Sequence, residues 1–176
     1  MPFVMYQALN RGIGWLARGI ATLGGLVLIV LIVMTSLSIT GRALIFLGLG
    51  PVKGDFELVE AGVAFAVFAF MPWCQYNRGH ARVDLFQPVF GAFLNKLIDL
   101  IADVMMFVAA YVIAWRLYLG MIDKLNYRET TFILQFEIWW SYAASFVGAA
   151  AFVLVSAFCI LRSLRALLGK PTDVTA

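Results

Sequence analysis

The stretch ATLGGLVLIVLIVMTSLSIT occupies residues 21–40 and lies inside an uncharged run of 23 residues between Arg18 and Arg42. At about 1.5 Å of rise per residue, a helix of this length can cross the roughly 30 Å hydrocarbon core of a bilayer. A secretory signal peptide is the alternative, since Arg11 and Arg18 precede the apolar run, but the run is longer than the hydrophobic region of an ordinary signal peptide. We therefore predict a first membrane span at about 19–41.

Three more segments are predicted to cross the membrane, at 56–77, 97–122 and 137–161. The last of them is almost entirely covered by 24 uncharged residues, from Ile138 to Leu161. Pro72, near the end of the 56–77 span, is expected to kink this helix without ending it, because neighbouring helices can satisfy the carbonyl group that proline leaves free.

The composition excludes a water-soluble fold. Of 176 residues, 63% are hydrophobic and 13% are charged, whereas soluble domains have about 45–50% apolar and about 25% charged residues. At about 20 residues per span, the length accommodates four helices with short connections and no second soluble domain. We expect an all-α integral membrane protein with four transmembrane helices, in which residues 1–176 form a single membrane domain.

Lysine and arginine are distributed unevenly between the two sides of the predicted membrane. Eight of them lie in the N-terminal tail, the loop after the second span and the C-terminal tail, and four lie in the other two loops. Positive residues accumulate on the cytoplasmic side of membrane proteins, so both termini are predicted to be cytoplasmic. Cys74 and Cys159 then lie near cytoplasmic helix ends, where thiols are kept reduced, and we expect no disulfide.

Between the second and third spans, apolar residues recur at intervals of three and four. Val83, Phe86, Phe90, Phe93 and Leu97 belong to this pattern, which indicates a short amphipathic helix at about 83–95. This helix is too short to span the membrane, and its apolar face is expected to rest in the cytoplasmic interface. The alternative is that the segment extends the third span toward the N-terminus.

The chain lacks the residues that most catalytic and cofactor sites require. His80 is the only histidine, which excludes bis-histidine haem ligation and His-rich metal sites. Gly48 and Gly50 are not followed by the Lys-Ser/Thr pair of a phosphate-binding loop. Nucleic-acid binding is unsupported, because the net charge of +3 is explained by the orientation bias. We expect a protein that is not an enzyme and binds no metal or cofactor of its own.

Charged residues inside a predicted span are candidates for function because they are costly in lipid. Asp99 and Asp103 share one face of the third span, where they could form a path for cations or protons, or a helix-start cluster that pairs with Lys96 or with another span. We favour the cluster, since acidic residues suit the positive N-terminus of a helix. Arg116 can reach the outer interface with its long stem or pair with a glutamate of another helix.

The fourth span carries two recognisable patterns of side chains. Ser141, Ser145 and Ala149 form a ridge of small residues, which permits close contact with another helix. Trp139 and Trp140 lie at the outer end of the span, where aromatic residues anchor membrane helices in the interface. The ridge therefore predicts a helix neighbour, and the tryptophans indicate the depth of the span.

The segment 42–86 carries a more specific pattern. A basic residue, Arg42, closes the first span, and an acidic pair, Glu57 and Glu60, opens the second. The second span then exits into a run of the form Arg-Gly-His-x-Arg-Val-Asp, which contains Arg78, His80, Arg82 and Asp84. This pattern resembles the small membrane subunit of tripartite ATP-independent periplasmic (TRAP) transporters, the DctQ-like family.

The resemblance implies a protein of the bacterial inner membrane that works with two partners. In the family, a periplasmic binding protein delivers an organic acid, and a large multi-span subunit carries it with coupling sodium ions by an elevator-like motion. The small subunit is thought to act as a scaffold for the large one and bears no established substrate site. The coupling sodium ions are therefore expected in the large subunit.

The same resemblance implies structural or partner-binding roles for particular residues. Arg42, Glu57 and Glu60 are expected at the outer ends of the first two spans, where they can pair with one another. The inner loop carries Arg78, His80 and Arg82, which are expected to meet anionic lipid headgroups or the large subunit, and Asp84, which is expected to have a partner-binding or structural role. Local capping of helix ends is the alternative explanation for all seven residues.

Two other functions are compatible with four short spans. The chain could be the membrane-anchor subunit of a respiratory oxidoreductase that holds haem or quinone between its helices, although a single histidine argues against haem. It could also be a self-contained small exporter that dimerises, although it lacks a mid-membrane glutamate. We expect the transporter-subunit function.

Overall fold

The computed structural model describes residues 3–79 and 91–168. Its elements are α1 (Phe3–Ala43), the short 3-10 helix η1 (Ile45–Leu47), α2 (Asp55–Tyr76), α3 (Ala92–Tyr127) and α4 (Trp139–Leu167). All four α-helices are long and apolar enough to cross a membrane, and the described residues contain no strand beyond an isolated bridge between Thr130 and Glu137. The predicted all-α fold with four membrane-spanning helices is confirmed.

Three of the described helices, α1, α3 and α4, continue past the predicted membrane limits, whereas α2 matches its predicted span within one residue at each end. α1 has 41 residues, about 60 Å at helical rise, which is roughly twice the hydrocarbon thickness. Lipid thickness does not set a helix end, because the backbone hydrogen bonds continue until a turn interrupts them. Such turns lie at Gly54, with φ 73° before α2, and at Arg78 and Arg128, whose φ angles of 52° and 48° follow α2 and α3. α2 runs through Pro72 without a break.

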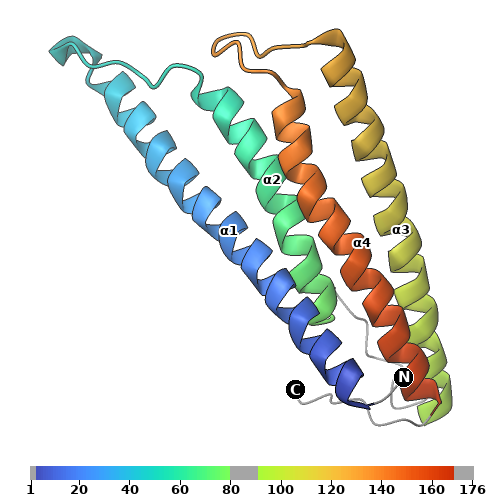
Figure 1. The fold of residues 1–176 in the computed structure, drawn as a ribbon. Helices are drawn as coiled ribbons and strands as arrows, with labels where there is room; N and C mark the ends of the chain where they lie inside the picture. The colour runs from blue at the N-terminus through green and yellow to red at the C-terminus, as the bar shows by residue number, and fades with distance from the viewer. Residues whose placement is uncertain (1–2, 80–90, 169–176) are drawn as a thin grey trace.

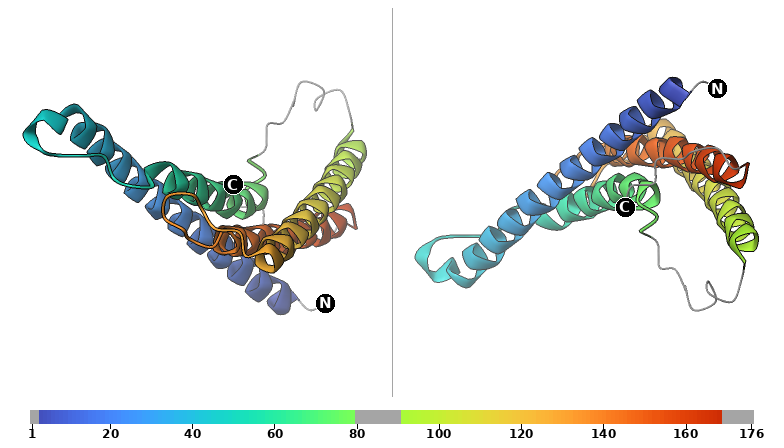
Figure 2. Two further views of the ribbon diagram at one scale, coloured as in Figure 1. Left: turned by 90° about the horizontal axis from the view of Figure 1, so that it is seen from above. Right: turned by 90° about the horizontal axis from the view of Figure 1, so that it is seen from below.

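The helices are arranged as a row in the order α1, α2, α4, α3 (Figures 1 and 2). α4 packs against both α2 and α3, whereas α1 packs mainly against α2. Half of the most apolar stretch of α4 is buried inside the protein, compared with 17% in each of the other three helices. α4 is therefore the central element, and α1 and α3 form the two edges of the row.

Small residues bring the neighbouring helices close together. A methyl group built on Gly148 of α4 would lie 2.7 Å from the backbone carbonyl of Phe68 in α2. On the other side of α2, a methyl group on Gly24 of α1 would lie 2.8 Å from the Cβ of Ala69. Ser145 and Ala149 are buried at the same α4 surface, so the ridge of small residues in the fourth span is a packing surface.

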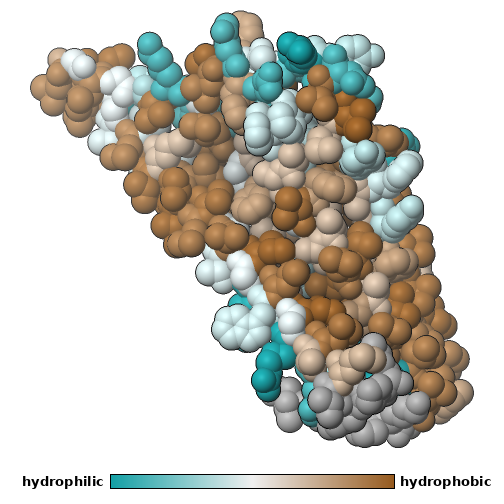
Figure 3. Space-filling view, viewed as in Figure 1, coloured by the Kyte–Doolittle hydropathy of each residue, from teal (hydrophilic) through white to brown (hydrophobic). Residues whose placement is uncertain are grey.

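One cluster of buried apolar residues lies toward one end of the row: Ala17, Val155 and Cys159, with Ile13, Trp73 and Tyr76 packed against them. Other buried residues, such as Leu31 and Ala69, lie elsewhere along the helices. Both cysteines are free. Most large apolar side chains of α1 and α3 remain exposed, and apolar surface covers the middle of the face seen in Figure 3, with polar residues gathered toward its ends. Such a surface suits lipid or another membrane protein as its neighbour.

Part of the segment between α2 and α3 lies outside the described residues. The predicted interfacial helix at 83–95 falls mostly within 80–90, which are not described, and its last residues, 92–95, form the first turn of α3. His80, Arg82 and Asp84 also lie outside the described residues. Of the predicted site residues, the structure places Arg42, Glu57, Glu60 and Arg78.

Candidate functional site

Polar side chains gather at both ends of the row. At one end, α2 and α4 terminate and α3 begins; we call it the Arg78 end. At the other, α1 and α3 terminate and α2 and α4 begin; we call it the Asp55 end. The contacts at these two ends are the candidate functional site.

The Arg78 end contains a cluster that joins three helices. The guanidinium of Arg78 donates to Asp99 at 2.9 Å and to Asp103 at 3.2 Å, both on α3, and to Ser163 on α4 at 2.6 Å. Ser163 in turn donates to Asp103 at 2.5 Å. Asp103 is buried, so its charge is compensated by a partly buried arginine and a hydroxyl, as buried carboxylates require.

The turn that ends α2 positions this arginine. Arg78 has a left-handed backbone conformation, and its N–H donates to the carbonyl of Gln75 at 3.1 Å. The side-chain amide of Gln75 donates to Asp103 at 3.4 Å. The two aspartates are thus paired with a residue that follows another span. The predicted pairing with another span is confirmed, with Arg78 as the cation that both aspartates share, but their predicted place at the start of the helix is wrong, because α3 begins at Ala92 and has no acidic residue in its first turn.

Aromatic and cationic side chains extend these contacts to α1. Arg162 of α4 donates to the backbone carbonyl of Tyr76 at 3.0 Å, and the hydroxyl of Tyr76 donates to the side chain of Asn10 at 2.9 Å. The guanidinium of Arg18 lies over the ring of Trp73, 5.1 Å from its centroid. All four helices are therefore linked at the Arg78 end.

At the Asp55 end, the expected pairing of Arg42 with Glu57 or Glu60 is wrong. Arg42 pairs with Asp55 instead, at 3.7 Å, and Asp55 also accepts a hydrogen bond of 2.5 Å from Ser38. Ser38 is fully buried and further accepts from the backbone N–H of Val52 at 3.2 Å. Asp55 is thus the carboxylate that joins the end of α1 to the start of α2.

Glu57 holds the loop between α3 and α4. Its two carboxylate oxygens accept the backbone N–H groups of Ile133 at 2.6 Å and of Leu134 at 2.9 Å. Lys124 pairs with Glu129 across the start of the same loop. Since one carboxylate satisfies two neighbouring amides, the loop is fixed against α2 rather than free to move away from it.

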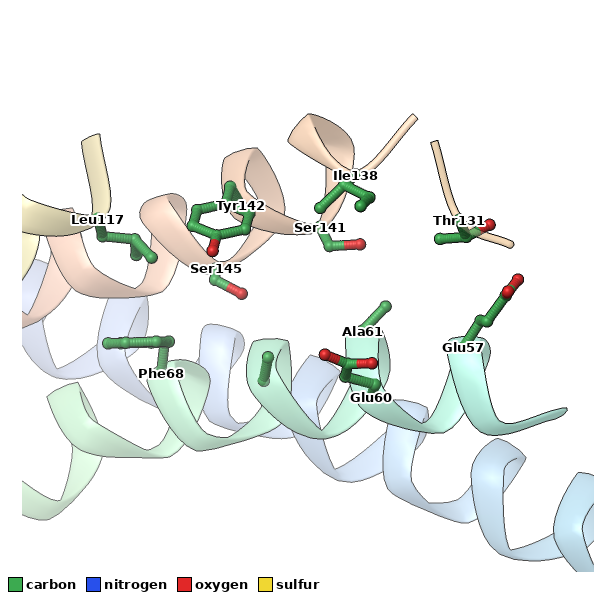
Figure 4. Close-up of a pocket in the computed structure, with 11 residues that line it drawn as sticks. Glu57, Glu60, Ala61, Phe68, Leu117, Thr131, Ile138, Ser141, Tyr142 and Ser145 are labelled. Atoms are coloured by element: carbon green, nitrogen blue, oxygen red, sulfur yellow. The ribbon is translucent and has the colours of Figure 1, made fainter. Parts of the chain in front are cut away.

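A cavity of about 280 Å³ opens between α2 and α4 on the same side as this loop (Figure 4). Glu57, Glu60 and Ala64 of α2 line one side, and Ser141 and Ser145 of α4 line the other. The two helices are in close contact where Gly148 meets the backbone of Phe68. The cavity lies between this contact and the loop before α4.

Sequence reasoning missed several polar residues of these contacts. Ser38, Gln75 and Ser163 are uncharged residues that are buried as hydrogen-bond partners of aspartates. The available signal was a polar side chain at a position that membrane helices usually fill with an apolar one. No group of three or more His, Cys, Asp or Glu side chains that could hold a metal ion occurs within 3–79 and 91–168.

Residues 31–167 match the family model described as the DctQ component of the tripartite ATP-independent periplasmic transporters. The chain belongs to the DctQ family. The match covers α2, α3 and α4 completely, together with the second part of α1. Comparison with curated proteins and with solved structures gives no match.

Membership of the DctQ family assigns the chain to the small membrane component of a TRAP transporter. The family works in a complex with a large membrane subunit and a binding protein. No finding supports the respiratory anchor as an alternative. In this DctQ chain, the contacts at the Arg78 and Asp55 ends fix helices relative to one another. The cavity between α2 and α4 carries polar groups that these contacts leave unused.

Proposed function

We propose that this DctQ chain is a non-catalytic scaffold in the bacterial inner membrane. It holds the large, elevator-type TRAP subunit during uptake of an organic acid that a periplasmic binding protein delivers, with sodium ions coupled in the large subunit. In this proposal both termini lie in the cytoplasm, so that the Arg78 end is cytoplasmic and the Asp55 end is periplasmic.

The polar contacts at both ends of the row carry this proposal. A scaffold must resist the force of a moving partner, and helices that are tied at both ends cannot slide past each other without breaking charge-assisted hydrogen bonds. Each of the four described helices is continuous between its bounds. Transport sites of secondary transporters are built from interrupted helices near mid-membrane, so these continuous helices favour a supporting role.

The large apolar faces left uncovered on α1 and α3 provide area for the partner and for lipid. Association of membrane helices depends on packing and on polar contacts rather than on exclusion of water. Arg42 and Glu57 support these faces indirectly, by fixing the start of α2 and the loop before α4. Arg78 has the same role at the cytoplasmic end, and we propose that His80, Arg82 and Asp84 contact lipid headgroups or the large subunit there.

Uptake into vesicles tests the proposal. The large subunit and the binding protein are reconstituted with and without this chain, and accumulation of the organic acid is followed in a sodium gradient. We expect accumulation to require the chain, and a tag on the chain to recover the large subunit in mild detergent. Undiminished accumulation without the chain would refute the scaffold function. Transport by the chain alone would establish the exporter alternative.

A further inference from the structure

Glu60 presents a carboxylate that no other described residue uses. It is exposed in this chain and has no hydrogen bond or ion pair among the described residues, in contrast to Glu57, whose two oxygens are both bonded. Two cations at the same end of the row have other partners, since Arg42 pairs with Asp55 and Lys124 with Glu129. A carboxylate on a membrane helix is costly without a partner, so Glu60 is available to a group from outside the chain.

Ser145 is a second unpaired group in the same cavity. Its side chain is buried, with 2% of the residue exposed, and its hydroxyl has no hydrogen-bond partner among the described residues. Hydroxyls on membrane helices usually bond to the carbonyl four residues earlier, as Thr35 and Ser36 of α1 do. Ser145 instead lies across the cavity from α2, and Figure 4 shows its oxygen on the side that faces Ala61 and Glu60.

The lining of the cavity selects the chemistry of its occupant. Between the carboxylate of Glu60 and the hydroxyls of Ser141 and Ser145, the surface is apolar, with Ala64 and Phe68 on α2. A metal site is disfavoured, because hard cations are held by several convergent carboxylates and the described residues contain no group of three or more His, Cys, Asp or Glu side chains that could hold a metal ion. A basic side chain fits better, because its methylene stem can lie on apolar surface while its charged head bonds to oxygens.

The arrangement of helices leaves a route for such a side chain. α2 and α3 each pack along α4 but do not pack against each other among the described residues, and the hydrogen bond between Gln75 and Asp103 that joins them lies at the Arg78 end, away from this cavity. Leu117 of α3 also lines the cavity, so the opening lies between α2 and α3 with α4 at its base. A neighbouring membrane protein can therefore reach Glu60 from the side.

We propose that this cavity receives a lysine or arginine side chain of the large TRAP membrane subunit, which pairs with Glu60 and donates to Ser145. The inference rests on the proposed function, because it takes the large subunit as the partner. Arginine suits the site well, since its five donors can reach oxygens on both sides of the cavity. The pair fixes the register of the partner against α2 and α4.

Binding of the large subunit to single-residue variants tests the pairing. The dissociation constant is measured in lipid nanodiscs at low and high salt. We expect Glu60→Gln to raise the dissociation constant about tenfold and to remove most of its salt dependence. Ser145→Ala is expected to raise the dissociation constant severalfold. Asp123→Asn removes an exposed carboxylate at the same end, and Ser156→Ala removes another buried, unpaired α4 hydroxyl that does not line the cavity. Both controls should stay within about twofold of wild type.

A photo-crosslinker separates loss of contact from loss of folding. Benzoylphenylalanine in place of Leu117, at the edge of the cavity, is expected to crosslink to the large subunit in the otherwise unchanged complex. Crosslinking only to lipid, or wild-type affinity of both Glu60→Gln and Ser145→Ala, would overturn the inference while leaving the scaffold function intact. A sodium-dependent rise in the melting temperature of the isolated chain that Glu60→Gln abolishes would identify a metal site instead. Failure of the wild-type chain to bind the large subunit would refute both proposals.

Discussion

Arg78 donates from the end of α2 to acceptors on two other helices. Asp103, one of these acceptors, has only 9% of its side chain exposed, whereas Arg78 and Asp99 keep somewhat more than a quarter. The charge of Asp103 is therefore the most dependent on its partners. Removing one member of a buried ion pair typically costs about 3–5 kcal/mol, because the other charge stays buried without compensation.

We predict that Arg78→Met lowers the free energy of unfolding in detergent by about 3 kcal/mol, at the lower end of that range, because the cluster is only partly buried. Arg116→Met is the matched control, since Arg116 is exposed and forms no ion pair with any described residue. It should change the unfolding free energy by less than about 1 kcal/mol. Equal effects of the two substitutions would show that the cluster contributes no stability.

The identity of individual partners could be predicted only in part. The sequence indicates that Asp99 and Asp103 lie on one face of a helix and need a cation. The cation is Arg78, which lies in the turn after α2 with a left-handed backbone conformation. No residue pattern in the sequence predicts that conformation. Arg42 had three carboxylates within reach at the start of the second span. The rotation of α2 about its axis, which depends on packing against α1 and α4, brings Asp55 to it and turns Glu57 toward the α3–α4 loop.

At the scale of the elements, the close contact between α2 and α4 depends on one glycine, Gly148, which has no side chain. Gly148 lies against the backbone of Phe68 and Ala69, and a methyl group added to it would lie 2.7 Å and 3.0 Å from the nearest atoms of these two residues. Backbone cannot rotate away as a side chain can, so an added methyl group must push the two helices apart. Overpacking of this kind typically costs about 1–3 kcal/mol.

We predict that Gly148→Ala lowers the unfolding free energy by about 2 kcal/mol, because strain outweighs the better helix propensity of alanine. Gly25→Ala in α1 is the control, since a methyl group there meets nothing within 4 Å. It is expected to be neutral or slightly stabilising. Both values can be measured by denaturation in mixed micelles, and a stabilised Gly148→Ala variant would contradict the close contact.

The existence of the helices was predictable, whereas their order in space was not. Long uncharged runs such as 21–40 specify a membrane helix through hydrophobicity alone. The order α1, α2, α4, α3 depends on which helix faces are complementary in shape. Because small residues occur on several helices, their spacing in the sequence could not predict that Gly148 contacts Phe68. The helix bounds also differ from the predicted spans, since α1 begins at Phe3 rather than near residue 19.

At the scale of the whole molecule, the orientation in the membrane decides which partner each end can meet. The Arg78 end contains Arg11, Arg18 and Arg162 in addition to Arg78, and because positive clusters favour the cytoplasmic side, we predict that this end is cytoplasmic. The Asp55 end carries Glu57, Glu60 and Glu129 and would face the periplasm. The proposed cavity would then open in the outer half of the membrane.

Thiol labelling in intact cells checks this orientation. In a background of Cys74→Ala and Cys159→Ala, a cysteine at Lys53 or at Glu129 is expected to react with a membrane-impermeant maleimide, and a cysteine at Asn77 is not. Permeabilised cells serve as the control, because all three positions should then react. The reverse pattern in intact cells would overturn the predicted topology.

The central place of α4 also determines the order of biogenesis. A ribosome releases helices from the N-terminus onward, so α1 and α2 can pair as soon as both have left the translocon. Among the described helices, α3 packs mainly against α4 and meets α2 through the bonds of Gln75 and Arg78 to its aspartates, so most of its helix packing forms only after the last quarter of the polypeptide is made. During that interval Asp103 lacks the hydrogen bond that Ser163 later donates, so the polar contacts around this buried carboxylate are complete only once the final helix has inserted.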